Sequence, residues 1–122
     1  MNALFVFIGG GLGSLARFGT NELTKKYFSG NFPSGTLLAN LISSLILGMF
    51  MGWFLSSEKN QEYSRFFIAT GFCGGFSTFS AFTFETFQLL KTGNIFLAVT
   101  NILISFAGCL LAMWLGWKII NA

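Results

Sequence analysis

Two apolar stretches of the sequence carry polar side chains at helical spacing. The first set consists of Thr36, Asn40, Ser43 and Ser44, and the second begins with Asn101 and Ser105. Their spacing puts each set on one face of a helix. A primary amide left without partners in hydrocarbon costs on the order of a few kcal/mol. The two sets therefore indicate either contacts between helices or a path for a hydrated or polar solute.

A third stretch contains a weak point for a helix. Gly74 and Gly75 are followed by Ser77 and Thr78, and this combination predicts a helix that is broken at Gly74-Gly75. Inside a membrane, the freed carbonyl groups of a broken helix must find partners in protein or around a bound ion. Carbonyl oxygens suit an alkali cation, and two symmetry-related breaks could share one ion.

Two phenylalanines follow the expected break. Phe79 and Phe82 share a helix face beside the hydroxyls of Ser80 and Thr83. A phenyl ring has an electropositive edge, so rings turned toward a narrow path would favour an anion. A cation path would be expected to show carboxylates, and Glu85 alone is available in this stretch. The alternative is that the rings are simple apolar bulk facing lipid.

Several kinds of chemistry are excluded by composition. The sequence has no histidine, the commonest metal ligand and general base, and too few ligands of other types for zinc. Its seven Lys or Arg residues form no cluster suited to nucleic acid. Cys73 and Cys109 lie in separate apolar stretches, where small buried side chains are favoured over a disulfide. Passive passage of an ion would involve no covalent step, so we expect no enzyme.

The elements that position these residues follow from hydropathy. The chain has 122 residues, of which 53% are hydrophobic and 9% charged, whereas a soluble domain carries about a quarter charged residues. Four segments reach the roughly 20 residues that a membrane-spanning helix needs: about 3–27, 34–55, 66–90 and 95–120. The sequence predicts an all-α, four-helix membrane protein with a single membrane domain over residues 1–122. The first segment lacks the features of a cleaved signal peptide, so we expect it to remain as a helix.

Glycines at four-residue spacing are best explained by helix packing. The pairs are Gly9 with Gly13, Gly48 with Gly52, and Gly71 with Gly75. Small residues at this spacing let two helices in a membrane approach closely.

The distribution of positive charge predicts two opposite orientations. One side of the expected bundle holds Lys25, Lys26 and Lys91, and the other holds Lys59, Arg65 and Lys118. The positive-inside rule gives no clear orientation for such a balance. Two inverted copies could then pair, and we expect an antiparallel homodimer.

The motifs together resemble the Fluc (CrcB-type) bacterial fluoride channels. The resemblance is carried by Gly9-Gly10-Gly11-x-Gly13-x-x-x-Arg17, by Gly35-Thr36-Leu37-x-x-Asn40, and by Gly71-Phe72-Cys73-Gly74-Gly75-x-Ser77-Thr78-Phe79-Ser80-x-Phe82. It covers nearly the whole chain. It implies a dual-topology homodimer in a prokaryotic plasma membrane, with two pores that passively export cytoplasmic fluoride and so reduce its toxicity.

The resemblance also implies roles for particular residues. A central structural Na⁺ would be held by the main-chain carbonyls of Gly74 and Ser77. Asn40 corresponds to the asparagine at the mouth of the pore, Arg17 to a vestibule arginine, and Glu85 to a glutamate that either anchors its helix or relays fluoride. The implied fluoride path comprises Asn40, Phe79, Ser80, Phe82, Thr83, Asn101 and Ser105. Cys109 departs from the hydroxyl expected on the last helix, and a thiol is the poorer donor.

Two other functions remain open from sequence. Small multidrug transporters are also four-helix, dual-topology dimers, but these proton-coupled cation exporters depend on a carboxylate in the first helix. Residues 3–16 contain no acid, and Glu85 lies in the third segment. A structural or assembly subunit of a larger membrane complex is the second alternative.

Overall fold

The computed structural model describes residues 1–28, 30–57 and 62–121. Ser29 and Lys59, which belong to the expected connections, lie outside the described residues. The described part is helical and contains no strand. Its elements in chain order are α1 (Asn2–Tyr27), α2 (Ser34–Ser56), α3 (Glu62–Ser64), the π-helix η1 (Arg65–Cys73), α4 (Gly74–Phe76), α5 (Phe79–Lys91) and α6 (Ile95–Asn121).

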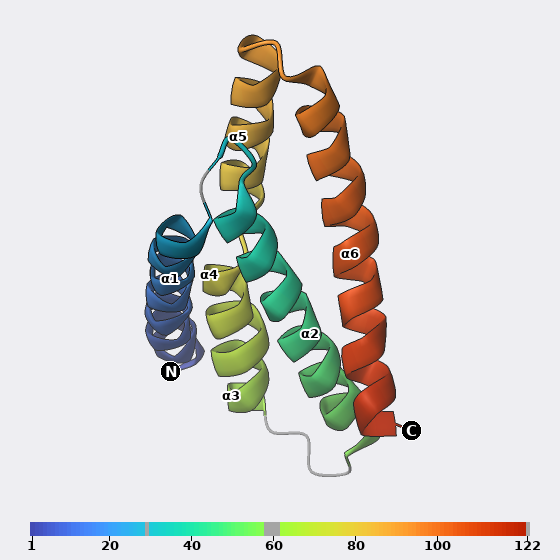
Figure 1. Ribbon diagram of the computed structural model, residues 1–122. Helices are drawn as coiled ribbons and strands as arrows, with labels where there is room; N and C mark the ends of the chain where they lie inside the picture. The colour runs from blue at the N-terminus through green and yellow to red at the C-terminus, as the bar shows by residue number, and fades with distance from the viewer. Residues whose placement is uncertain (29, 58–61, 122) are drawn as a thin grey trace.

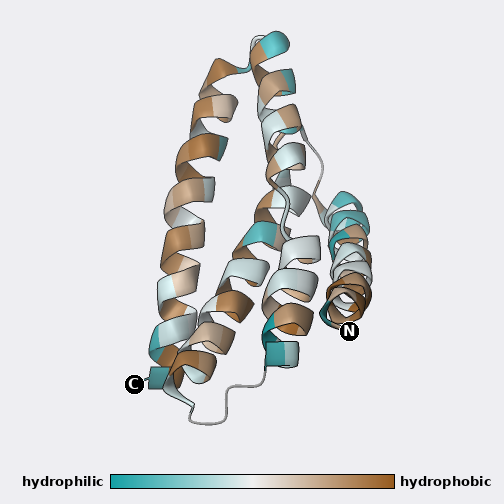
Figure 2. Ribbon diagram, turned by 180° about the vertical axis from the view of Figure 1, so that it is seen from behind, coloured by the Kyte–Doolittle hydropathy of each residue, from teal (hydrophilic) through white to brown (hydrophobic). Residues whose placement is uncertain are grey.

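Four helical runs are long and apolar enough to cross a membrane. They are Asn2–Tyr27, Ser34–Ser56, Glu62–Lys91, which spans α3 to α5, and Ile95–Asn121. Hydrophobic residues cover most of their length, and hydrophilic residues gather near their ends (Figure 2). The expected four-helix membrane architecture is therefore confirmed, and the third run begins four residues earlier than the expected residue 66.

The runs alternate in direction, so the two chain ends lie at the same end of the bundle (Figure 1). α2 packs along α6, while α1 packs against η1 and α4. α5 leans against α6 and extends past the end of α1. The residues that follow α4 therefore lie beside α2, and α5 lies beside α6.

Apart from Gly52, which faces side chains of α6, the glycines of the predicted pairs lie where helix backbones touch. A methyl group added at Gly9 would collide with the Phe67 carbonyl, and one added at Gly13 would collide with the Phe72 carbonyl. Gly48 and Gly116 make the corresponding close approaches between α6 and α2. These positions need glycine because any side chain would push two backbones apart.

The predicted break at Gly74-Gly75 is at the wrong position. Both glycines are helical in α4, and Gly75 lies against the Gly10 carbonyl of α1. The backbone is extended instead at Ser77 (φ −79°, ψ 157°) and Thr78 (φ −153°, ψ 124°), after which α5 begins at Phe79. The glycines are thus used for close helix contact, and the interruption falls on the hydroxyl residues that follow them.

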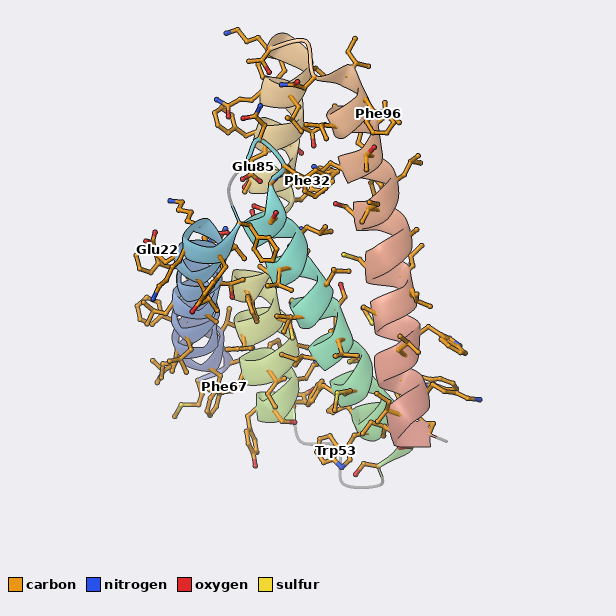
Figure 3. The ribbon with its side chains drawn as sticks, viewed as in Figure 1. Glu22, Phe32, Trp53, Phe67, Glu85 and Phe96 are labelled. Carbon is orange, nitrogen blue, oxygen red and sulfur yellow. The ribbon has the colours of Figure 1, made fainter. Side chains whose placement is uncertain are left out.

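Large apolar side chains cover the outside of the bundle. Phe96, Trp53 and Phe67 are among the side chains that point away from the ribbon (Figure 3), and Phe96 is 81% exposed. Few large side chains are buried, chiefly Phe50, Phe54, Phe76, Phe82 and Leu89. An exterior of this kind suits lipid or a second protein surface.

Candidate ion path

A groove of about 230 Å³ lies beside the helix interruption. Three helices and the extended segment contribute to its walls. The lining residues are Asn40, Ser44, Ser77, Thr78, Phe79, Phe82, Ser105, Phe106 and Cys109. Of the path residues expected from sequence, it contains Asn40, Phe79, Phe82 and Ser105. The others, Ser80, Thr83 and Asn101, do not line it.

Three phenyl rings meet in this groove. The Phe82 side chain is buried, and its ring centroid lies 5.7 Å from that of Phe79 and 5.9 Å from that of Phe106. The Phe82 and Phe106 planes cross at 83°, so one ring meets the other edge-on. Phe79 is 70% exposed. Sequence reasoning missed Phe106, although its three-residue spacing from Cys109 could have indicated a shared helix face.

Asn40 is bound to the extended segment by two hydrogen bonds. The Thr78 N–H donates to Asn40 Oδ1 at 2.8 Å, and Asn40 Nδ2 donates to the Thr78 carbonyl at 3.2 Å. One helical turn further along α2, the Ser43 hydroxyl donates to the Cys73 carbonyl at 3.0 Å. α2 thus contacts the main chain on both sides of the α4 segment.

The carbonyls at the end of α4 lose their usual helical donors at the interruption. The Thr78 N–H, which would continue the helix by donating to Gly74, donates to Asn40 instead. The Ala81 N–H, four residues after Ser77, donates to Thr78 Oγ1 at 3.2 Å and so caps α5. The Gly74 and Ser77 carbonyls are therefore among the groups that the interruption releases for another partner.

Asn101 is buried between α5 and α6. Asn101 is 1% exposed, and its Nδ2 donates to Thr86 Oγ1 at 2.9 Å. The Ser105 hydroxyl donates to Asn101 Oδ1 at 3.3 Å. Ser105 alone of these three lines the groove. The amide of Asn101 thus connects two helices, and Thr86 is a partner that the sequence did not indicate.

Ser80 and Thr83 lie on the exposed face of α5. The Thr83 hydroxyl donates to the Phe79 carbonyl at 2.9 Å, and Ser80 Oγ lies 3.3 Å from Thr78 Oγ1. Within one chain they are outside the groove.

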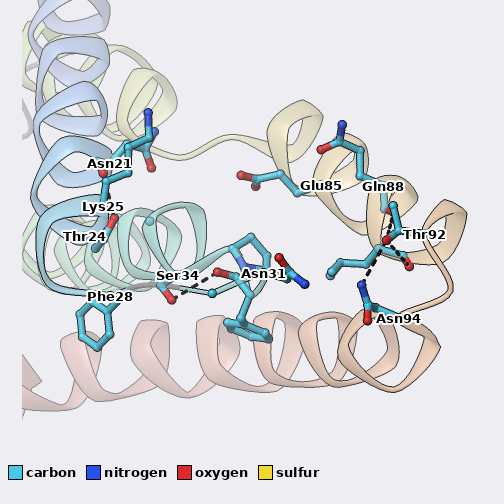
Figure 4. A pocket seen from close by; sticks show the side chains of 15 residues that line it. Asn21, Thr24, Lys25, Phe28, Asn31, Ser34, Glu85, Gln88, Thr92 and Asn94 are labelled. Carbon is cyan, nitrogen blue, oxygen red and sulfur yellow. Dashed lines mark hydrogen bonds between the residues drawn. The ribbon is translucent and has the colours of Figure 1, made fainter.

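Glu85 lines a different cavity, of about 610 Å³, at the end of the bundle. Figure 4 shows its carboxylate pointing into this space, together with Asn21, Asn31 and Gln88. Glu85 Oε1 is buried and has no hydrogen-bond partner among the described residues. Arg17 is half-buried on α1 and lines neither this cavity nor the groove.

Comparisons with known proteins agree with the motifs. A family model described as "CrcB-like protein, Camphor Resistance (CrcB)" matches residues 4–117. A Coxiella burnetii protein named "Fluoride-specific ion channel FluC" is 39% identical over 117 residues, covering 95% of this chain and 94% of its own. Two proteins of the same name come from Citrifermentans bemidjiense (37% over 119 residues; 98% of this chain and 96% of the relative) and Francisella tularensis (41% over 121 residues; 96% and 92%). The chain belongs to the CrcB-like protein family.

Proposed function

We propose that this protein is a passive, fluoride-selective ion channel. The relatives that cover nearly its whole length are named as fluoride-specific ion channels, so the chain is not an enzyme. The observation that carries the proposal is the groove, where phenyl rings and hydroxyl groups meet beside an interrupted membrane helix.

Fluoride is small and strongly hydrated, so a path must replace its water shell. In the groove, the Ser44 hydroxyl can donate to an ion. The hydroxyls of Ser77 and Ser105 donate to the Cys73 carbonyl and to Asn101 Oδ1, and each would have to turn from that partner to meet the ion. The edges of Phe79 and Phe82 offer weaker positive potential without a full charge. Weak neighbouring sites allow the ion to bind and then leave, which conduction requires.

A second copy of the chain completes this path. Phe79 is 70% exposed in one chain, and Ser80 and Thr83 lie on the same exposed helix. An antiparallel partner would cover α5 and bring these residues beside a closed passage. Twofold symmetry would then give two pores, and Ser80 and Thr83 would join each path.

The released carbonyls of Gly74 and Ser77 fit a structural Na⁺ at the centre of such a dimer. Oxygen atoms are the ligands that hard cations prefer, and main-chain carbonyls of unwound helices serve this purpose in membrane proteins. The two copies together would supply the ligands, and the ion would hold the two interruptions in register. Exchange of Na⁺ for a large organic cation during purification should therefore abolish fluoride efflux, and unchanged efflux would contradict this part of the proposal.

Arg17 and Glu85 have roles outside the groove. A half-buried guanidinium on α1 would attract anions toward the mouth of the passage. Glu85 either anchors α5 in the end cavity or relays fluoride between that cavity and the path. The natural location is a prokaryotic plasma membrane, where the channel would release fluoride that accumulates in the cytoplasm.

A proton-coupled cation exporter is disfavoured by the position of its required acid. Glu85 faces the end cavity and does not line the groove. Proton-driven transport of an organic cation, lost in Glu85→Gln, would favour the exporter. A purely structural subunit would show no activity when reconstituted alone.

The direct test is ion efflux from liposomes that contain only the purified protein. Fluoride efflux, followed with a fluoride electrode, should be fast, and chloride efflux from matched vesicles should be negligible. Chloride efflux as fast as fluoride efflux would contradict fluoride selectivity. Folded protein that shows no fluoride efflux would contradict the channel function.

A further inference from the structure

The carboxamide of Asn40 pairs with a single main-chain residue. It accepts from the Thr78 N–H at 2.8 Å and donates to the Thr78 carbonyl at 3.2 Å. Thr78 is extended, with φ −153° and ψ 124°, and an extended residue presents its N–H and carbonyl on the same side. The side chain therefore occupies the place that a neighbouring peptide group would take in a β-ladder.

This pairing solves a specific problem at the interruption. An extended residue between two membrane helices leaves both of its main-chain polar groups without helical partners, which is costly in an apolar setting. Asn40 provides a partner for each group. Aspartate, serine or leucine at this position would lack the matched donor and acceptor on one flat group.

The consequences reach the groove through the main chain. With Thr78 held extended, its hydroxyl accepts from the Ala81 N–H and caps α5. α5 then begins at Phe79, and Phe79 and Phe82 line the groove. Holding Thr78 in this way uses Asn40 Oδ1 and one of the two N–H groups on Nδ2.

We propose that Asn40 is a positioning residue, which acts on ion passage by holding Thr78 extended rather than by serving chiefly as a ligand of the ion. This inference rests on the proposed channel function. It assigns to Asn40 a main-chain partner that neither the side-chain pattern nor the motif had indicated.

The test is a double-variant cycle that changes the two partners separately. Asn40→Ala removes the side-chain half. An ester in place of the Thr78 amide, introduced as the α-hydroxy analogue of threonine, removes the N–H while every side chain remains. It also makes the Ser77 carbonyl a weaker acceptor, an effect that does not depend on Asn40 and that the cycle therefore separates from the shared contact. The matched control is the same ester at Thr92, whose N–H donates to the Gln88 carbonyl at 3.0 Å at the far end of α5. Initial fluoride efflux is measured for each monodisperse protein in liposomes.

Positioning through Thr78 predicts strongly coupled losses. Asn40→Ala and the Thr78 ester should each slow efflux by roughly tenfold. The combination should be within about twofold of the slower single change, because both changes disrupt the same contact. The Thr92 ester should match the unmodified chain.

Two results would overturn the inference. The Thr78 ester could retain full efflux, or the two losses could multiply, as expected if Asn40 binds the ion independently of Thr78. If Asn40→Ala does not yield monodisperse protein, Asn40→Leu replaces it in the cycle, because it keeps the side-chain volume without the polar groups. An unmodified chain that folds but moves no fluoride would instead refute the channel function itself.

Discussion

The three rings at the groove have different surroundings within one chain. Phe82 is buried and touches both Phe79 and Phe106, whereas Phe79 and Phe106 are largely exposed. A buried ring is held by its neighbours, whereas an exposed ring is free to contact lipid or a second chain. Phe82 is therefore the ring whose position is set within a single chain.

Replacing Phe82 with isoleucine should slow fluoride efflux while leaving the protein folded. Isoleucine fills apolar space but has no electropositive edge, and a contact worth about 1 kcal/mol to the ion at its barrier slows passage roughly fivefold when lost. Phe79→Ile should act in the same direction. The control is Phe96→Ile, an exposed ring on α6 that lines neither cavity. If both groove variants transport normally, the ring edges have no role.

The Asn101 amide stabilises the contact between α5 and α6 and does not line the groove. Asn101→Leu removes the partner of the buried Thr86 hydroxyl and of Ser105. We expect a loss of about 1–3 kcal/mol in unfolding free energy, because buried polar groups are left unpaired. The measurement is thermal or denaturant unfolding in detergent. Thr100→Val is the matched control, since that exposed hydroxyl donates to the Phe96 carbonyl of its own helix. Equal effects of the two variants would contradict this role.

At the scale of the elements, α1 is held by backbone contact with η1 and α4. Gly9 and Gly13 approach main-chain atoms of η1, and Gly75 approaches the Gly10 carbonyl. Close approach increases dispersion contacts, which drive helix association in lipid where the hydrophobic effect between helices is absent.

A methyl group at this contact should separate α1 from the bundle. Gly13→Ala would meet the Phe72 carbonyl and, at 2.8 Å, the Phe76 N–H. We expect about 1–3 kcal/mol of destabilisation from this overpacking, seen as a lower unfolding temperature. Gly11→Ala has open space around the new methyl group and should be neutral or slightly stabilising, since alanine favours a helix over glycine. Similar losses in both variants would show that the contact is unimportant.

Sequence predicted the helices well because apolar length alone sets a membrane span. It misplaced the break because Gly74 and Gly75 were interpreted as helix breakers, whereas Gly75 serves contact with Gly10. At the observed interruption Thr78 pairs with Asn40, a contact across 38 residues that local sequence does not encode. The π-helical hydrogen bonding of η1 has no residue signature either.

The site was predicted in part for a related reason. Helical spacing brought Asn40, Phe79, Phe82 and Ser105 to one groove. It could not distinguish a polar residue that faces the groove from one that pairs inside the bundle, as Asn101 does, or one that faces outward, as Thr83 does. Those distinctions depend on the packing of α5 against α6 and on what covers the exterior.

At the scale of the whole molecule, the two ends of the bundle carry nearly balanced charge. Lys25, Lys26 and Lys91 lie at the end where α1 and α5 finish, and Arg65 and Lys118 lie toward the other. This arrangement is consistent with the proposed insertion in both orientations.

Topology reporters at the chain terminus should therefore be active on both sides of the membrane. Replacing Lys25 and Lys26 with glutamine should favour one orientation and reduce fluoride efflux, because antiparallel pairs become scarce. Efflux should be restored when this variant is co-expressed with a second variant chain that carries both Arg65→Gln and Lys118→Gln, because the two chains then favour opposite orientations. A single-sided reporter signal from the unmodified chain would rule out dual topology.

Fluoride conduction requires that the groove beside Phe79 and Phe82 be closed into a continuous path. An experimental structure of the assembled protein in lipid tests this most directly. We predict that a second, antiparallel copy covers α5, and that the ring edges face a continuous passage joining the two sides of the membrane. Rings turned toward acyl chains, with no passage beside them, would contradict it.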